Sequence, residues 1–119
     1  MNRVLSMLFV LACLSTQAQP KDSKIRAFLE AHRNNWQDLN VPYEDGEALY
    51  NLILEKKYTR ALEIGTSTGH STIWIAWALS KTGGKLITLE IDEGRHKQAL
   101  TYLRELDLLP FVDAQLCDA

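Results

Sequence analysis

Residues 61–76 read ALEIGTSTGHSTIWIA, and this stretch changes character twice. An apolar run ends in an acid and a glycine, small polar residues follow, and an apolar helical pattern then begins. The pattern predicts a strand over Arg60–Ile64, a loop over Gly65–Gly69 and a helix over His70–Lys81. The first N–H groups of a helix lack partners within the helix. A glycine-bearing loop that opens directly into one therefore predicts a cradle for a small anionic group.

The same alternation continues toward the C-terminus. A strand is predicted over Lys85–Ile91, a helix capped by Asp92 over Glu93–Leu106, and a strand over Phe111–Cys117. Strands that alternate with helices indicate an α/β fold, here a Rossmann-like parallel sheet wrapped by helices. Right-handed crossovers give the strand order 3-2-1. The sequence stops in the loop after the third strand, so we expect a sheet truncated at that point.

Two helices are predicted ahead of the sheet, in an N-terminal helical cap segment over residues 19–57. The first starts at a cap formed by Asp22 or Ser23 and runs to about Leu39, and the second covers Asp45–Lys57. Residues 58–119 would then form the ligand-binding half of a domain. Trp74 and Trp77 are expected to pack against the sheet.

Residues 1–18 have the pattern of a secretory signal peptide. A basic start is followed by the apolar run Val4–Leu14 and by small residues that end at Ala18, after which we expect cleavage. The run is shorter than the ~20 residues that span a bilayer. We therefore expect export, to the periplasm or outside the cell. The alternatives are lipoprotein anchoring through the lipobox-like VLAC at Val10–Cys13, or a buried N-terminal helix in a cytoplasmic protein.

Composition bounds the function classes. The chain has 119 residues, enough for one domain, with 46% apolar residues and a net charge of −2. This charge gives no electrostatic reason to expect nucleic acid or an anionic membrane as a partner. After removal of Cys13 only Cys117 would remain, which excludes an intramolecular disulfide and a cysteine-based metal site.

The loop itself excludes two nucleotide-binding motifs. A P-loop needs a lysine after its last glycine, and here His70 follows Gly69. The dinucleotide pattern G-x-G-x-x-G has a second glycine where Ser67 stands. An NAD(P)-dependent oxidoreductase therefore stays only as an alternative. Gly65 and Gly69 allow a ligand to approach the backbone closely, and the hydroxyls of the loop and of Ser71 add hydrogen-bond donors.

Two acids suggest which ligand fits. Glu90 lies at the tip of the second predicted strand, where a carboxylate can accept ribose hydroxyls. Glu63 lies two residues before Gly65, where it can meet an ammonium group, directly or through water. An ammonium, a carboxylate and a ribose occur together in an amino acid joined to a nucleoside, as in S-adenosylmethionine.

At this point the motifs resemble a known family. The stretch ALEIGTSTGHSTIWIAWAL resembles the first motif of class I S-adenosylmethionine-dependent methyltransferases, nearest to the O-methyltransferases of the catechol and caffeoyl-CoA type. LITLEID is similar to their second motif, with Glu90 at the ribose position, and CDA at residues 117–119 to the motif beside adenine. VPYEDGEAL, from Val41, is similar to the segment that covers the cofactor. His70 and Cys117 depart from the usual tyrosine and glycine.

The resemblance implies an S-adenosylmethionine-dependent O-methyltransferase that acts on a small-molecule acceptor, with a homodimer as one arrangement. A divalent metal and the catalytic residues would follow the fourth strand, so the metal ligands are not in this chain and the catalytic residues stay unknown. An exported, non-catalytic remnant of the fold is a further alternative. The expected cofactor-binding residues are Glu63, Gly65, Thr66, Ser67, Gly69, Ser71, Glu90, Asp118 and Ala119.

Overall fold

The computed structural model describes residues 19–37 and 39–118, so the predicted signal peptide and Ala119 lie outside the described residues. The sheet consists of β1 (Arg60–Ile64), β2 (Lys85–Glu90) and β3 (Val112–Leu116), in the order β1-β2-β3 with both pairs parallel. This is the predicted order read from the opposite edge, so the parallel α/β arrangement is confirmed.

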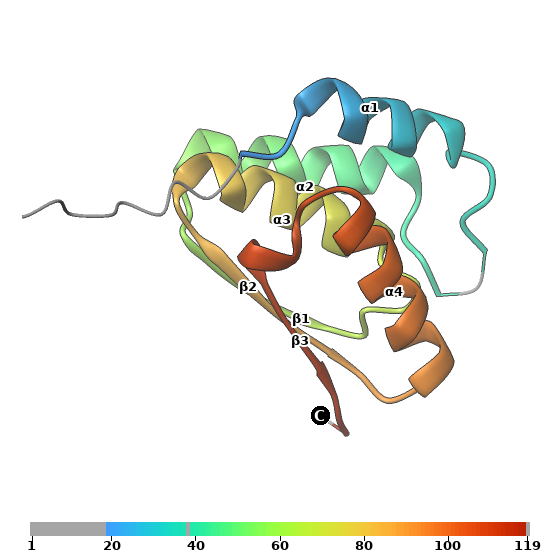
Figure 1. The fold of residues 1–119 in the computed structure, drawn as a ribbon. Coiled ribbons are helices and arrows are strands. Elements are labelled where there is room, and N and C mark those ends of the chain that lie inside the picture. Colours follow the sequence, from blue (N-terminus) through green and yellow to red (C-terminus); the bar gives the residue numbers. More distant parts are fainter. Residues whose placement is uncertain (1–18, 38, 119) are drawn as a thin grey trace, which may run out of the picture.

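The α-helices of the described residues all lie on one side of this sheet, with α3 and α4 against it (Figure 1). They are α1 (Asp22–Ala31), α2 (Tyr43–Lys56), α3 (His70–Thr82) and α4 (Glu93–Glu105), and a short 3₁₀ turn, η1 (Leu109–Phe111), precedes β3. Side chains of β2 alternate between the two faces of the sheet, so that Leu86, Thr88 and Glu90 are buried under the helices. Helix α3 is the centre of the core, with every residue from Thr72 to Ser80 buried.

Helix α1 is shorter than the sequence predicts. It ends at Ala31 and a turn follows, whereas the apolar spacing predicted a helix to about Leu39. The aromatic side chains that follow Ala31 pack on the helix: the His32 ring stacks on Phe28 at 4.0 Å, and the Trp36 ring lies 6.4 Å from that of Phe28. The apolar residues whose spacing predicted one long helix therefore form an aromatic cluster at the end of a shorter helix. Asp22 is not the cap, because Lys21 occupies that position.

The two tryptophans of α3 pack against α1 and α2. Trp74 and Trp77 are both almost completely buried, and Tyr50 of α2 lies 4.4 Å from the Trp77 ring. Gly46 makes this packing possible, because a Cβ atom on Gly46 would lie 2.1 Å from the Trp74 ring. Trp77 also donates its indole N–H to Asp22 of α1 at 2.8 Å. The two indoles thus join α1 and α2 to α3.

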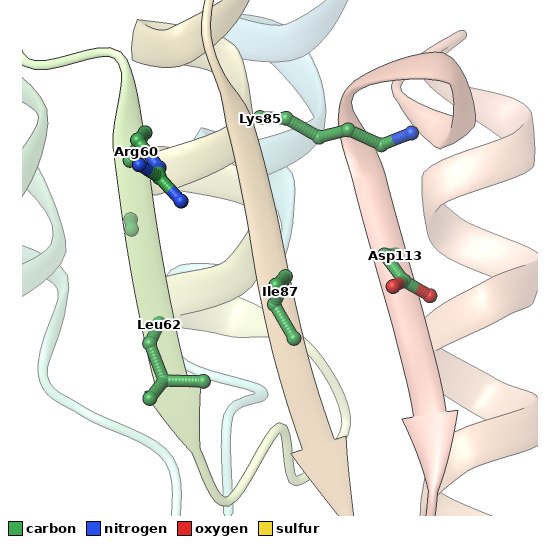
Figure 2. A pocket seen from close by; sticks show the side chains of 6 residues that line it. Arg60, Leu62, Lys85, Ile87 and Asp113 are labelled. Carbon is green, nitrogen blue, oxygen red and sulfur yellow. The ribbon is translucent and has the colours of Figure 1, made fainter.

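No helix of the described residues covers the other face of the sheet (Figure 1). Leu62, Ile64 and Ile87 point outward on this face and are 65%, 70% and 42% exposed. Near the amino ends of the strands this face is hollowed by a cavity of about 480 Å³, whose lining includes Arg60, Lys85 and Asp113 (Figure 2). Parallel sheets are usually covered on both faces. The sheet formed by the described strands is unusual because helices of the described residues cover only one of its faces. No helix in the described part of the chain is long and apolar enough to cross a bilayer.

Candidate functional site

The glycine loop (residues 65–69) joins β1 to α3 at the carboxyl end of the sheet. The N–H groups of Gly65 and Thr66 both donate to the carbonyl of Leu89 on β2, at 2.8 and 3.0 Å. Gly65 has φ +91° and Gly69 has φ +104°, values that L-residues rarely adopt. A Cβ atom on Gly65 would meet nothing within 4 Å, whereas one on Gly69 would lie 3.2 Å from the Ala99 Cβ of α4. Gly65 therefore presents bare backbone to open space, while Gly69 lets α4 approach.

Glu90 is a buried carboxylate at the end of β2, only 5% exposed. Its Oε2 accepts a hydrogen bond from the Ser67 N–H at 2.6 Å, and its Oε1 accepts from Ile91 and Asp92 N–H at 3.1 and 3.2 Å. Burying a charged group is costly unless it is hydrogen-bonded. These three backbone donors satisfy that need and leave about one of the four lone-pair positions of the carboxylate for another donor.

Glu63 lies in a different setting, beneath the loop. It accepts hydrogen bonds from the hydroxyls of Ser71 and Thr72 on α3, both at 2.5 Å, and from Thr88 on β2 at 2.7 Å. Because Thr88 donates to Glu63, the hydroxyl of Thr66 must donate to Thr88 across their 2.5 Å contact. The carboxylate of Glu63 thus anchors a chain of hydroxyls that ends in the glycine loop.

A cavity of about 220 Å³ lies where the carboxyl ends of the three strands meet. Among the predicted site residues, Gly65, Glu90 and Asp118 line it; Glu63 does not. Cys117 is also in the lining, and its N–H donates to the Glu90 carbonyl at 2.8 Å, which continues the pairing of β2 with β3. The carboxylates of Glu90 and Asp118 in the cavity wall can accept hydrogen bonds from hydroxyl or amino groups of a ligand. The lining residues of the cavity are Ile64, Gly65, Leu89, Glu90, Ile91, Cys117 and Asp118.

The other predicted residues that the structure describes are not part of the cavity lining. Thr66 and Ser67 are buried within the loop, at 1% and 4% exposure, and Ser67 adopts φ +52°. The Ser71 hydroxyl donates its hydrogen bond to Glu63. Ala119 lies outside the described residues. Among the described residues, no cluster of three or more His, Cys, Asp or Glu side chains could hold a metal ion.

Two side chains next to the loop were not predicted as site residues. Thr88 links Glu63 to the loop, and its place opposite Glu63 in the sheet register was readable from the pairing of the two strands. Asn40 donates to the Thr68 hydroxyl at 2.9 Å and accepts from the His70 N–H at 3.5 Å. Nothing in the pattern around Asn40 signals this contact, because the two partners are about thirty residues away in sequence.

The comparisons with known proteins agree on one family. A sequence model described as O-methyltransferase matches residues 15–119. An O-methyltransferase from Bacillus cereus, solved with S-adenosylhomocysteine, is 33% identical with a TM-score of 0.65, and the match covers 82% of this chain and 44% of that protein. The O-methyltransferase TomG from Streptomyces achromogenes, solved with S-adenosylmethionine, is 32% identical with a TM-score of 0.64, over 81% and 43%.

A more distant methyltransferase from Podospora anserina, solved with S-adenosylhomocysteine, matches the whole chain and 54% of its own length. It is 16% identical with a TM-score of 0.68, so it shows a shared fold alone. The chain spans less than half the length of either bacterial protein.

Proposed function

Because the chain belongs to the O-methyltransferase family, we propose that it binds S-adenosylmethionine and supplies the cofactor-holding part of an enzyme that methylates an oxygen of a small molecule. The observation that carries this proposal is the cavity at the carboxyl ends of the strands, in which bare backbone at Gly65 faces open space and the Glu90 carboxylate lies in the wall. Ligands of open α/β sheets bind at this end of the strands.

The described residues fit the nucleoside part of the cofactor. Glu90 keeps a lone-pair position for a ribose hydroxyl, and a charge-assisted hydrogen bond of this kind contributes about 1.5–3 kcal/mol. Ile91, Cys117 and Asp118 would lie beside the base. The cavity volume of about 220 Å³ is below the ~300–1,000 Å³ typical of ligand pockets, so the described residues would hold only part of the cofactor.

The amino-acid tail would lie over Gly65, where a Cβ atom would meet nothing within 4 Å. Glu63 would support the ammonium group from beneath, through the hydroxyls of Ser71 and Thr66 that its carboxylate network holds in place. The bound cofactor supplies an activated methyl group on a sulfonium. The residues of this chain would bind and orient it, and the residues that position the acceptor stay unassigned.

Calorimetric titration of the full chain with S-adenosylhomocysteine and, separately, with NAD tests the proposal. Micromolar binding of S-adenosylhomocysteine without NAD binding supports the methyltransferase assignment. Binding of NAD alone would favour the oxidoreductase alternative, in spite of the serine at position 67. Binding of neither would favour the non-catalytic alternative.

Export is a separate proposal, which rests on the signal-like pattern of residues 1–18. Expression with its own N-terminus in a bacterial host, followed by fractionation and intact mass measurement, tests it. A periplasmic product that starts at Gln19 supports export, and a lipid-modified Cys13 supports anchoring. A full-length cytoplasmic product would contradict both. Export would also place the chain away from cytosolic S-adenosylmethionine, which favours the non-catalytic alternative.

A further inference from the structure

The connection between α1 and α2 is attached to the amino end of α3 by two polar side chains. Asn40 joins the Thr68 hydroxyl to the His70 N–H. The ring of His70, which is completely buried, contacts the carbonyl of Val41 through Nδ1 at 2.7 Å. Stacking on the same imidazole adds to this attachment, with the Trp36 ring 4.4 Å from the His70 ring and 12° from parallel. We call these contacts of Asn40 and His70 the latch.

The latch requires a neutral imidazole. The Val41 carbonyl can only accept, so Nδ1 of His70 carries the hydrogen and donates it. The indole N–H of Trp74 can only donate, so Nε2 of His70, at 3.1 Å, must accept it. Protonation would place a hydrogen on Nε2 against the indole N–H and would put a buried cation at the positive end of the α3 dipole. Both changes oppose the latched arrangement.

The surroundings of the ring offer little to compensate a positive charge. No carboxylate of the described residues forms an ion pair with His70. Burial lowers the pKa of the His70 imidazole, and the hydrogen bond to Val41 opposes this only in part. The titratable groups nearest the ring are Tyr43 of α2 and, behind Trp36, His32 after α1 and Tyr102 of α4. Arg33 stacks on Tyr43 and forms ion pairs with Glu30 and Glu44, so these two acids face Arg33.

We propose that the latch makes adenosyl-ligand affinity depend on pH, because the neutral ring of His70 positions the glycine loop and the α1–α2 connection together. This inference rests on the proposed function. His70 acts here as a positioning residue and has no contact with the reacting atoms. Once the latch opens, Thr68 loses its Asn40 partner, and the loop that presents Gly65 loses one of its supports.

The sign of the effect follows from proton linkage. The pKa of His70 is lower in the latched state than in an open, solvated state, for which about 6.5 is the ordinary value. The open state therefore binds more protons between these two pKa values. The latch is fully stable above about pH 6.5 and weakens as the pH falls toward the latched-state pKa. For one proton, affinity falls by at most about tenfold per pH unit.

The test measures the dissociation constant of S-adenosylhomocysteine at pH 7.5, 6.5 and 5.5. For the wild type we expect weakening by threefold or more between pH 7.5 and 5.5. His70→Asn keeps an amide donor toward Val41 and does not titrate, and His70→Phe keeps only the stacking. Both should give profiles flat within twofold, with His70→Asn binding more tightly than His70→Phe at pH 7.5. Asn40→Ala should bind more weakly at every pH but keep the slope.

His96→Gln is the matched control, because His96 lies on α4, outside the latch. It should keep the wild-type profile, and so should His32→Gln. A flat wild-type profile would overturn the proposal. So would a pH slope that persists in His70→Asn and His70→Phe, or one that disappears in His96→Gln or His32→Gln.

A second measurement separates failure of the latch from failure of the proposed function. Hydrogen exchange of the His70 backbone N–H, which donates to Asn40 in the latch, corrected for intrinsic exchange rates, needs no ligand. Protection lower at pH 5.5 than at pH 7.5 in the wild type, but equal in His70→Asn, supports the latch even if S-adenosylhomocysteine does not bind. Equal protection at both pH values in the wild type overturns the latch, whatever the ligand does.

Discussion

The backbone N–H of Ser67 donates a 2.6 Å hydrogen bond to the carboxylate of Glu90, which joins the loop after β1 to the end of β2. The two residues are 23 positions apart in sequence. The same carboxylate also receives the N–H groups of Ile91 and Asp92, and it lines the cavity beside Gly65. Glu90 therefore holds the loop in shape while it remains available to a ligand.

Substitution of Glu90 should affect both binding and stability. Glu90→Ala removes the acceptor for a ribose hydroxyl and leaves three backbone donors without their partner. We expect the dissociation constant of S-adenosylhomocysteine to rise tenfold or more, and the free energy of unfolding to fall by about 1–3 kcal/mol. Glu90→Gln should fall between Glu90→Ala and the wild type in both measurements. Glu105→Gln on the exposed end of α4 is the control; unchanged affinity in Glu90→Ala would remove Glu90 from the site.

Gly65 and Gly83 form a matched pair. Both have positive φ values, +91° and +79°, and a Cβ atom on either would meet nothing within 4 Å. Alanine at each position should therefore cost a similar backbone strain, about 1–2 kcal/mol. Only Gly65 lines the cavity, so Gly65→Ala should also weaken S-adenosylhomocysteine binding by tenfold or more in calorimetry. Equal affinities for the two variants would mean that Gly65 serves the turn alone.

Glu63 should matter for stability through its three hydroxyl partners. Glu63→Gln removes the charge and replaces one acceptor oxygen with a donor that faces hydroxyls. We expect a loss of about 1–3 kcal/mol in urea unfolding. Glu55→Gln, on the exposed side of α2, should change stability by less than about 0.5 kcal/mol. If the two variants unfold alike, the hydroxyl network around Glu63 contributes little.

The contact of α2 with α3 at Gly46 gives a test of packing. Alanine is the better helix former by about 1 kcal/mol, yet a Cβ atom at Gly46 would lie 2.1 Å from Trp74. Gly46→Ala should therefore lower stability by about 1–3 kcal/mol. Ala48→Gly, at an exposed position of the same helix, should cost less than about 1 kcal/mol. Thermal unfolding that ranks the two variants in the reverse order would contradict this close approach.

The open face of the sheet should govern self-association of this chain. Leu62 and Ile64 are 65% and 70% exposed and lie on β1, at the edge of the described sheet. Exposed apolar edges favour pairing with other chains. Leu62→Ser should raise the highest concentration at which the chain is still monomeric in sedimentation velocity. It should not lower the melting temperature. Leu52→Ser, at a 43% exposed position of α2, is the control. A wild-type sample that is monomeric at high concentration would contradict the prediction.

The sequence by itself determined the order of the elements and the family. The switch from strand to helix at Gly65–Gly69 predicted β1 and α3 with little error, and the parallel order of the strands is confirmed. The family resemblance, drawn from motifs at three strand ends, is also confirmed. These features are local, because hydrophobic periodicity, glycines in the left-handed region and the Asp92 cap act within a few residues of chain.

Tertiary structure decided which side chains meet. Both Glu63 and Glu90 were read as ligand-facing acids, but only Glu90 lines the cavity, since α3 brings two hydroxyls against Glu63 and β2 brings a third. The early end of α1 and the placement of Trp74 against Gly46 also depend on helix packing. So does the stacking of His70 on Trp36. Such contacts join residues of different elements, so periodicity and spacing, which are properties of neighbours within one element, carry no record of them.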